Sequence, residues 1–510
     1  MKTLAPAVVV LALAAQGAIG APSARAQDPP APAREERIEA MRKAWEIPGL
    51  AVAIVHGDSV DARGYGVLEI GRPERVDGHT LFAIGSTTKA FTAAAVGILV
   101  EEGRLGWDDR VVDRLPGFAL SDPWVTRRLT VRDLLAHRSG LPMANLMWLT
   151  GLHDRPELIR RLRWLDSDGG FRADLAYQNV LYAAAGSIVE EIAGVPWEAF
   201  VRDRMLGPLG MSRTRTGVRD LAKEENVAAP HARVDGEVGP VPYRDIDAVG
   251  PAGSIVSSAA DMARWLGLHL SGEESDGRPL SAAVLAETHR PQIVMSGGPG
   301  LALFYPRTRF LAYGMGWVVS DYAGRTLLDH GGGIDGMTAL VALVPEENLG
   351  VAILANRQLP APPYWILYDV LDEVLGLERT DWSARFLETV AAFSLPPDLP
   401  RLEGTAPSLP LDRYVGTYHS SPLGAAEVAR DGGGLSIRLG SLAAPLQHWH
   451  LDTFRAPWSD RAWRSAAGPG WITFRADRTG EIEALVLEAI PGETWEFDRR
   501  EPEAPPGPNR

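Results

Sequence analysis

The stretch at residues 82–89, FAIGSTTK, joins a short apolar run and a turn glycine to the pattern Ser-x-x-Lys. The residues from Phe91 to Leu105 have the apolar spacing of a helix, so the pattern lies where this predicted helix begins. Residues three apart on a helix share a face, and the Lys89 amine can therefore approach the Ser86 hydroxyl. The stretch predicts a serine nucleophile with a lysine beside it.

Lysine is a plausible base for this serine, because a serine hydroxyl is a poor nucleophile until its proton is removed. Burial disfavours the ammonium form and lowers the pKa of a lysine, whereas arginine keeps its proton. The chain has 51 Lys and Arg residues, of which only Lys2, Lys43, Lys89 and Lys223 are lysines. Ser-x-x-Lys is short, however, and a helix-capping serine with a solvated lysine is the competing interpretation.

Two later triplets could complete such a site. Tyr177-Gln178-Asn179 lies in a loop before a helix predicted from Leu181 to Ala193. His330-Gly331-Gly332 follows a strand predicted from Arg325 to Asp329. A Ser-x-x-Lys motif with Ser-Asp-Asn and Lys-Thr-Gly triplets downstream is typical of β-lactamases and penicillin-binding proteins. The order of the three motifs is the same here.

Four more segments extend this pattern: Leu129 to Leu141, Pro208 to Met211, Ala252 to Ile255 and Tyr313 to Trp317. With the three motifs, they make most of residues 50–356 resemble the serine β-lactamase and penicillin-binding-protein family. The Tyr-x-Asn form of the second motif resembles class C β-lactamases, D-aminopeptidases and related esterases. His137 lies at helical spacing from Asp133, and we expect a structural part for it.

The resemblance implies a role for each motif residue. Ser86 would be the acylated nucleophile, with Lys89 as the base. A partly ionised Tyr177 phenol would carry the proton to the leaving group and help to activate water for deacylation. Substrate binding would fall to Asn179, which would also contact Lys89, and to the cleft-lining strand with His330, Gly332 and Gly333. The backbone N–H groups of Ser86 and Gly333 would form the oxyanion hole.

The third motif departs from the family, because His330 stands where β-lactamases usually carry a lysine. An unperturbed histidine is mostly uncharged at neutral pH, so a substrate carboxylate would be held less firmly. We therefore expect an amide or ester substrate, such as a D-amino-acid amide, a peptide or an ester. A class C-type β-lactamase or D-Ala-D-Ala carboxypeptidase is the alternative. A slowly acylating penicillin-binding sensor is the alternative of another class.

The order of predicted elements indicates an α/β (α+β) fold. Strands are expected at Leu50 to His56, Val60 to Ile70, Leu311 to Ser320, Thr338 to Pro345 and Gly350 to Asn356, with helices between the early and late groups. This favours an antiparallel sheet flanked by helices, with an all-helical domain inserted. From Tyr414 to Phe497, short alternating runs predict an all-β domain without a notable helix, which resembles a lipocalin-like barrel.

The predicted boundaries follow from composition. Residues 1–26 read as a signal peptide with cleavage after Ala26, 27–37 and 379–409 as linkers, 38–378 as the hydrolase domain, 410–500 as the barrel and 501–510 as a disordered tail. The apolar run from Leu4 to Ala15 is too short for a membrane span. We therefore expect a secreted or periplasmic protein with no stable membrane span after cleavage.

Composition limits the remaining possibilities. The chain has no cysteine, so it has no disulfide and no cysteine ligand for a metal. The net charge of −14 at pH 7 argues against nucleic acid as a partner. His448-Trp449-His450 lacks a carboxylate companion, so we predict no metal and no cofactor. The expected partner is a small-molecule or peptide substrate, such as a fragment derived from peptidoglycan.

Overall fold

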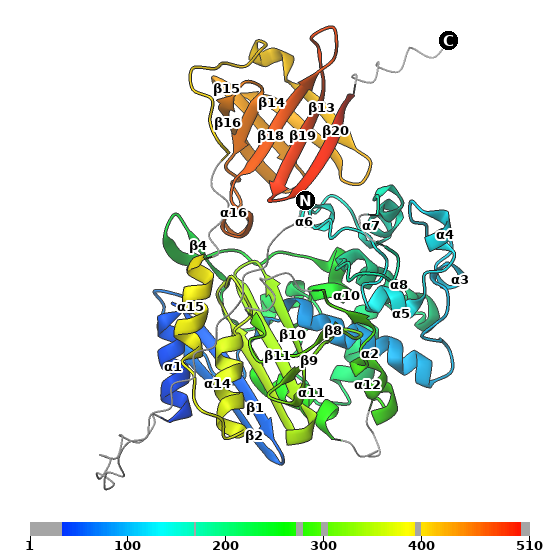
Figure 1. Ribbon diagram of the computed structural model, residues 1–510, viewed down its shortest axis with the longest axis vertical. Coiled ribbons are helices and arrows are strands. Elements are labelled where there is room, and N and C mark those ends of the chain that lie inside the picture. Colours follow the sequence, from blue (N-terminus) through cyan, green and yellow to red (C-terminus); the bar gives the residue numbers. More distant parts are fainter. Residues whose placement is uncertain (1–32, 168–169, 272–278, 297–303, 393–398, 501–510) are drawn as a thin grey trace, which may run out of the picture.

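The computed structural model describes residues 33–167, 170–271, 279–296, 304–392 and 399–500. Two parts are apparent (Figure 1): an α/β part with a large sheet, and a β-barrel that lies above it. The predicted signal peptide and the predicted C-terminal tail fall outside the described residues.

The large sheet is antiparallel and has the strand order β2-β1-β12-β11-β10-β9-β8-β7. Its strands come from both ends of the hydrolase part, as expected: β1 (Gly49–His56), β2 (Ser59–Gly66), β7 (Ile293–Val294), β8 (Leu311–Tyr313), β9 (Val318–Tyr322), β10 (Arg325–Ile334), β11 (Met337–Val344) and β12 (Leu349–Ala355). The stretch predicted as one strand from Leu311 to Ser320 is split into β8 and β9, because Gly316 takes a positive φ of 82° between them.

Alternating side chains of the central strands feed two separate cores, as the two-residue period of a strand requires. On β11, Ala339 and Val341 belong to the larger core, whereas Leu340 and Ala342 belong to the smaller one. The smaller core is covered by α1 (Arg34–Ala44), α14 (Tyr364–Val374) and α15 (Trp382–Ala392), in which Trp45 stacks on Trp365 at 3.6 Å. Helix α15 lies within the range that composition marked as a linker.

The opposite face of the sheet carries the helical part, between β2 and β7 (Figure 1). It comprises α2 (Thr88–Glu101), α3 (Val111–Arg114), α4 (Pro123–Thr126), α5 (Val131–Leu135), α6 (Leu146–Leu149), α7 (Arg155–Arg161), α8 (Asn179–Ala193), α9 (Trp197–Val201), α10 (Gly250–Gly253), α11 (Ala259–Leu270) and α12 (Ala282–His289). Two small antiparallel sheets complete it: β3 (Phe82–Ala83) pairs with the distant β6 (Val256–Ser257), and β4 (His231–Val234) forms a hairpin with β5 (Glu237–Pro240). Helix α2 is almost entirely buried, which makes it the central helix of this part.

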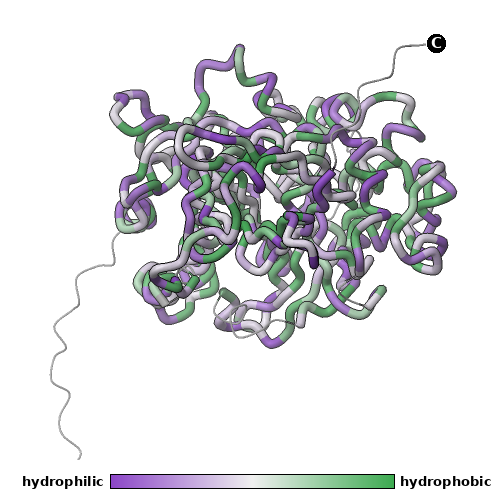
Figure 2. Tube along the Cα trace, turned by 90° about the horizontal axis from the view of Figure 1, so that it is seen from above, coloured by the Kyte–Doolittle hydropathy of each residue, from purple (hydrophilic) through white to green (hydrophobic). Residues whose placement is uncertain are grey.

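The C-terminal part is a closed barrel in which β20 (Glu493–Arg500) pairs with β13 (Gly416–Ser420). The other strands are β14 (Gly424–Asp431), β15 (Gly434–Leu439), β16 (Leu442–His450), β17 (Thr453–Ala456), β18 (Gly470–Ala476) and β19 (Ile482–Ile490). Buried and exposed residues alternate along β14, and hydrophobic and hydrophilic colours likewise alternate over short distances along the chain (Figure 2). Aromatic rings such as Tyr414, Phe454 and Phe474 fill the interior.

One prediction for the barrel was wrong, because it contains a helix, α16 (Arg461–Ala467). Asp460 caps this helix by accepting from the Trp463 backbone N–H at 3.0 Å. Ala462 packs with Ala232, Val234 and Val241 around the β4–β5 hairpin of the other part. One apolar position of this helix is therefore buried by a contact with the hydrolase part, which a local pattern does not reveal.

Asp329 on β10 is an ionisable group in the core of the sheet. Its Oδ1 accepts hydrogen bonds from Tyr305 at 3.1 Å and Tyr364 at 2.8 Å. Its Oδ2 has no partner among the described residues, and burial raises the pKa of this carboxyl to about 7. A neutral carboxylic acid fits this environment.

The raised pKa predicts a pH-dependent stability that Asp329→Asn should remove. Between about pH 4 and pH 7 the folded protein holds this proton more tightly than the unfolded chain, so stability falls as pH rises through that window. As the pH rises from 5 to 8, we expect the free energy of unfolding of the unsubstituted protein to fall by about 2 kcal/mol relative to that of Asp329→Asn. Urea unfolding at both pH values measures this, and a constant difference would contradict it.

Candidate active site

Ser86 lies in a tight turn at the start of α2. Residues Gly85–Thr87 form one 3₁₀ turn, and α2 follows directly, so the Ser-x-x-Lys spacing spans the junction. Gly85 has a positive φ of 50°, and a Cβ there would lie 2.7 Å from the Gly333 backbone nitrogen. This position therefore requires glycine, both for its backbone conformation and for the close approach of β10.

Lys89 is fully buried behind Ser86, with an exposed fraction of 0%. Its Nζ lies 3.1 Å from the Ser86 Oγ, 2.8 Å from the Asn179 Oδ1 and 2.8 Å from the Ala252 carbonyl oxygen. Burial lowers the pKa of this amine well below its usual range. In the part of the chain that the structure describes, no carboxylate forms an ion pair with Lys89, so nothing offsets that effect.

The second motif sits on the other side of Lys89, at the start of α8. Asn179 is the first residue of this helix, and Gln178 caps it by accepting from the Val180 backbone N–H at 2.9 Å. The Lys89 Nζ lies 4.8 Å from the centre of the Tyr177 ring. A hydrogen bond with Ser86 lowers the pKa of Tyr177, but burial raises it by more, so the net shift is upward.

The expectation of a partly ionised phenol is therefore wrong for this resting site. A phenol with a raised pKa is neutral at physiological pH. Burial thus favours the neutral amine at Lys89 and the neutral phenol at Tyr177. The physical reason is the same in both cases, since burial disfavours whichever form carries the charge.

His137 belongs to the site, although its sequence position indicated only a structural part. Its ring lies 4.2 Å from the Tyr177 ring, and its Nδ1 accepts from the Gln178 backbone N–H at 3.1 Å. The backbone φ of 55° is in the left-handed region, which is unusual for a histidine. Asp133, its expected neighbour, instead binds Arg138 and Arg172. His137 thus supports the loop that carries Tyr177 and Asn179.

The third motif lies on the half of β10 that has a free edge. Strand β9 pairs only with residues 325–329 of β10, and the turn of Ser86 lies against the remainder. A Cβ on Gly332 would lie 2.0 Å from the Ile84 carbonyl oxygen and 3.2 Å from the Ser86 nitrogen. Gly333 is exposed, with open space where a side chain would be. The structure thus brings the backbone of Gly332 and Gly333 beside Ser86.

His330 is buried and uncharged rather than a cation that faces the cleft. Its Nδ1 lies 2.7 Å from the Gly331 carbonyl oxygen and must donate to it, so its Nε2 accepts from the Tyr313 hydroxyl at 3.0 Å. Burial, together with the nearby Lys89, lowers the pKa of His330 to about 3. The third motif therefore carries no positive charge at neutral pH.

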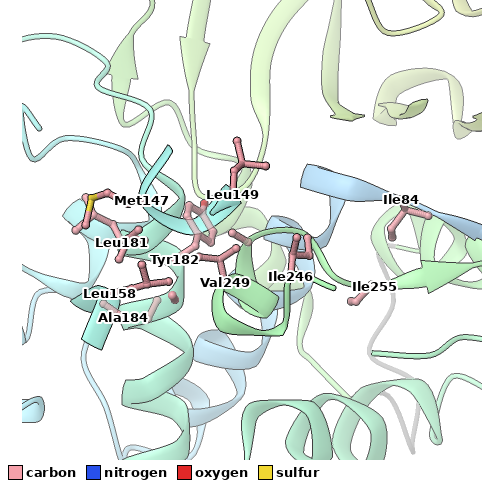
Figure 3. Packing of buried hydrophobic residues seen from close by; sticks show 14 of the residues in the cluster. Ile84, Met147, Leu149, Leu158, Leu181, Tyr182, Ala184, Ile246, Val249 and Ile255 are labelled. Atoms are coloured by element: carbon pink, nitrogen blue, oxygen red, sulfur yellow. The ribbon is translucent and has the colours of Figure 1, made fainter. Parts of the chain in front are cut away.

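The segments that extended the resemblance meet around Lys89. Ala252 supplies the carbonyl that Lys89 contacts, and Gly316 approaches the backbone nitrogen of Ala90 so closely that a Cβ would lie 2.8 Å from it. Ile84, Ile246 and Ile255 belong to the hydrophobic core of this part (Figure 3).

Within the described ranges, no group of three or more His, Cys, Asp or Glu side chains is placed to hold a metal ion. His448, a residue considered for that role, lies with its Nε2 2.9 Å from the Leu451 carbonyl oxygen. Among the described residues, no helix is long and apolar enough to span a bilayer.

The tight contact at Gly332 predicts that Gly332→Ala disrupts the site. The added methyl must displace either β10 or the Ile84 peptide, and we expect the reaction of Ser86 with a fluorophosphonate to slow at least about 100-fold. Gly267→Ala on α11 is the control, since its Cβ meets nothing within 4 Å. Rate constants from intact-mass spectrometry test this, and equal rates for the two variants would refute it.

Comparisons with known proteins agree with this geometry. Residues 36–373 match the family Beta-lactamase, and residues 400–502 match a domain of unknown function, DUF3471. The chain is 30% identical over 437 residues to Unguisins hydrolase ungD of Aspergillus violaceofuscus, and this alignment covers 78% of this chain and 76% of that protein. It is 31% identical over 361 residues to Penicillin-binding protein 4 of Amycolatopsis lactamdurans, which covers 68% of this chain and 91% of that protein.

A solved structure shows the same fold. The octameric penicillin-binding protein homologue from Pyrococcus abyssi aligns with a TM-score of 0.60 and 22% identity, over 91% of this chain and 98% of that chain. The match to the family extends over most of the α/β part and contains all three motifs. The chain therefore belongs to the Beta-lactamase family of serine hydrolases.

Proposed function

We propose that this protein is an exported hydrolase that cleaves an amide or ester bond through an acyl-enzyme on Ser86. The observation that carries the proposal is the fully buried Lys89, whose amine lies 3.1 Å from the Ser86 hydroxyl and has no carboxylate partner among the residues that the structure describes. The N-terminal pattern with predicted cleavage after Ala26 supports export.

The contacts of Lys89 favour a role as general base. A neutral amine has two N–H donors and one lone pair, and two carbonyl oxygens, Asn179 Oδ1 and Ala252 O, each lie 2.8 Å away. If the two donors bind these oxygens, the lone pair is left for the third neighbour, the Ser86 hydroxyl. The hydroxyl can then donate its proton to Lys89 as Ser86 attacks a carbonyl carbon.

Tyr177 supports the second half of the reaction. The neutral phenol can give its proton to the leaving amine or alcohol and regain one from the Lys89 ammonium. In deacylation the same groups would remove a proton from water and return it to Ser86. The backbone N–H groups of Ser86 and Gly333 are the candidates to stabilise the oxyanion, since they lie on adjacent backbone segments.

The uncharged His330 supports a substrate without a tightly held carboxylate. A lysine at this place would offer a permanent charge, whereas His330 uses both ring nitrogens within the protein. A D-amino-acid amide, a peptide or an ester fits this site. The similarity to a protein named Unguisins hydrolase supports a hydrolytic reaction.

The nucleophile assignment predicts a covalent adduct on one peptide. A fluorophosphonate should add its phosphonyl group to Ser86, and Ser86→Ala should abolish labelling. Lys89→Arg should slow labelling by about 1,000-fold, since arginine keeps its proton and cannot act as the base. Peptide mapping by mass spectrometry checks this, and a label elsewhere would remove Ser86 from its proposed role.

The substrate assignment predicts an order of preference. The second-order rate constant for a p-nitrophenyl ester or D-alanine anilide should exceed that for nitrocefin, a β-lactam with a carboxylate, by about 100-fold, roughly the value of one lost charge-assisted contact. Efficient turnover of nitrocefin alone would favour a β-lactamase. A stable penicillin adduct without turnover of any substrate would favour a penicillin-binding sensor.

A further inference from the structure

Asn145 fixes the orientation of Asn179 beside Lys89. The Asn179 Oδ1 faces Lys89, and its Nδ2 donates to the Asn145 Oδ1 at 3.0 Å. The same Asn145 oxygen accepts from the Trp148 indole N–H at 3.1 Å. Because Asn145 presents an oxygen, Asn179 must turn its nitrogen toward it and its oxygen toward Lys89.

Asn145 in turn depends on α6, the short helix that follows it. Ala144 has a positive φ of 49°, so the backbone entering the helix is held by its surroundings rather than by local preference. Met147 and Leu149 anchor one side of α6 in the core (Figure 3). A four-residue helix is too short to be stable by itself, so its other contacts matter.

The barrel supplies those contacts at both ends of α6, which lies at its lower edge (Figure 1). The Glu493 Oε1, at the start of β20, lies 3.5 Å from the Leu146 backbone nitrogen. The Glu493 carboxyl group also accepts from the Asn145 backbone N–H, which lowers its pKa against the larger effect of burial. Trp495 donates its indole N–H to the same oxygen at 2.8 Å and so holds the carboxylate in place.

The far end of α6 is bound as closely. The Ser441 backbone N–H donates to the Thr150 carbonyl oxygen at 2.8 Å. A Cβ on Gly440 would lie 2.2 Å from that same oxygen, so the two backbones touch. Arg244 reaches across as well, with Asp335 on one side and Asp460 of the barrel on the other. The barrel therefore contacts α6 at both of its ends.

We propose that Glu493 of the barrel is a positioning residue for Lys89 and Asn179, and that it acts through Asn145. The inference rests on the proposed function of Lys89 as the base. The connection runs from the Glu493 carboxylate to the backbone of Asn145, from the Asn145 side chain to Asn179, and from Asn179 to the amine. The barrel thus belongs to the catalytic unit.

Loss of Glu493 should act on the base in a recognisable way. Without the carboxylate, the backbone N–H groups of Asn145 and Leu146 lose their acceptor, and α6 is free to shift. A displacement of about 1 Å at a catalytic group can cost about 100-fold in rate. Any water that then reaches the amine stabilises its ammonium form, so Lys89 should lose its proton only at higher pH.

The experiment compares variants of the full-length chain by the pH dependence of kcat/KM for a p-nitrophenyl ester. Glu493→Ala should lower kcat/KM about 10-fold at pH 7 and move the acid limb upward by about 0.5 to 1 pH unit. Glu493→Gln keeps an acceptor oxygen and should stay within about 3-fold of the unsubstituted protein. The matched control is Glu496→Ala, on the same strand but exposed and paired with Arg475, which should leave the profile unchanged.

Asn145→Ala tests the path without touching the barrel, because Glu493 contacts only the backbone of this residue. It should shift the acid limb in the same direction, and the double variant should be no worse than the stronger single variant. Additive effects, or a Glu493→Ala profile identical to that of the unsubstituted protein, would overturn the coupling. Absence of turnover and of a Ser86 adduct in the unsubstituted protein would instead overturn the proposed function itself.

Discussion

Burial of the Lys89 amine without a counter-charge is the constraint on which the site depends. Moving an ammonium ion out of water costs several kcal/mol unless an opposite charge compensates it. A carboxylate beside Lys89 would supply that compensation and would also keep the amine protonated. The protein instead surrounds it with the carbonyl oxygens of Asn179 and Ala252, which orient the group without adding charge. Burial lowers the pKa of Lys89, and the described residues place no carboxylate beside the amine to raise it again.

The fold serves this constraint by bringing distant segments to one point. The turn before α2 provides Ser86, α2 provides Lys89, α8 provides Asn179, α10 provides Ala252, and β10 passes over the turn of Ser86. Their close approach is possible because glycines stand where backbones touch, at Gly85, Gly316 and Gly332. Close packing of this kind limits how far the side chains of a site can move, and catalytic groups in general need such precise placement.

The family, the sheet and the barrel could be predicted from the sequence, because each produces motifs or alternating apolar residues within single stretches of the chain. The ionisation state of the Tyr177 phenol could not be predicted from such a pattern. Its ionisation depends on burial by residues from several elements, and the burial raised its pKa instead of lowering it. His137 was missed as a neighbour of Tyr177 for a related reason, since α5 ends at Leu135 and the helical spacing from Asp133 does not hold beyond it. Helix α16 is short, and its Ala462 is buried against residues of the β4–β5 region, more than 200 residues earlier in the chain, so its local pattern did not reveal it.

Two of the three glycines after His330 are required by close contacts, and the third leaves open space beside the strand. Gly331 is small because Pro362 lies where its Cβ would be, at 2.4 Å. Gly332 is small because the Ile84 peptide lies there, whereas the space at Gly333 is open toward solvent. A Lys-Thr-Gly motif would add a charge and a hydroxyl to this strand. Here the strand has its backbone groups and the open space at Gly333. His330, which stands where β-lactamases usually carry a lysine, uses its ring nitrogens to bind Tyr313 and Gly331. The strand therefore provides backbone groups and open space, but no positive charge from His330, for contact with a substrate.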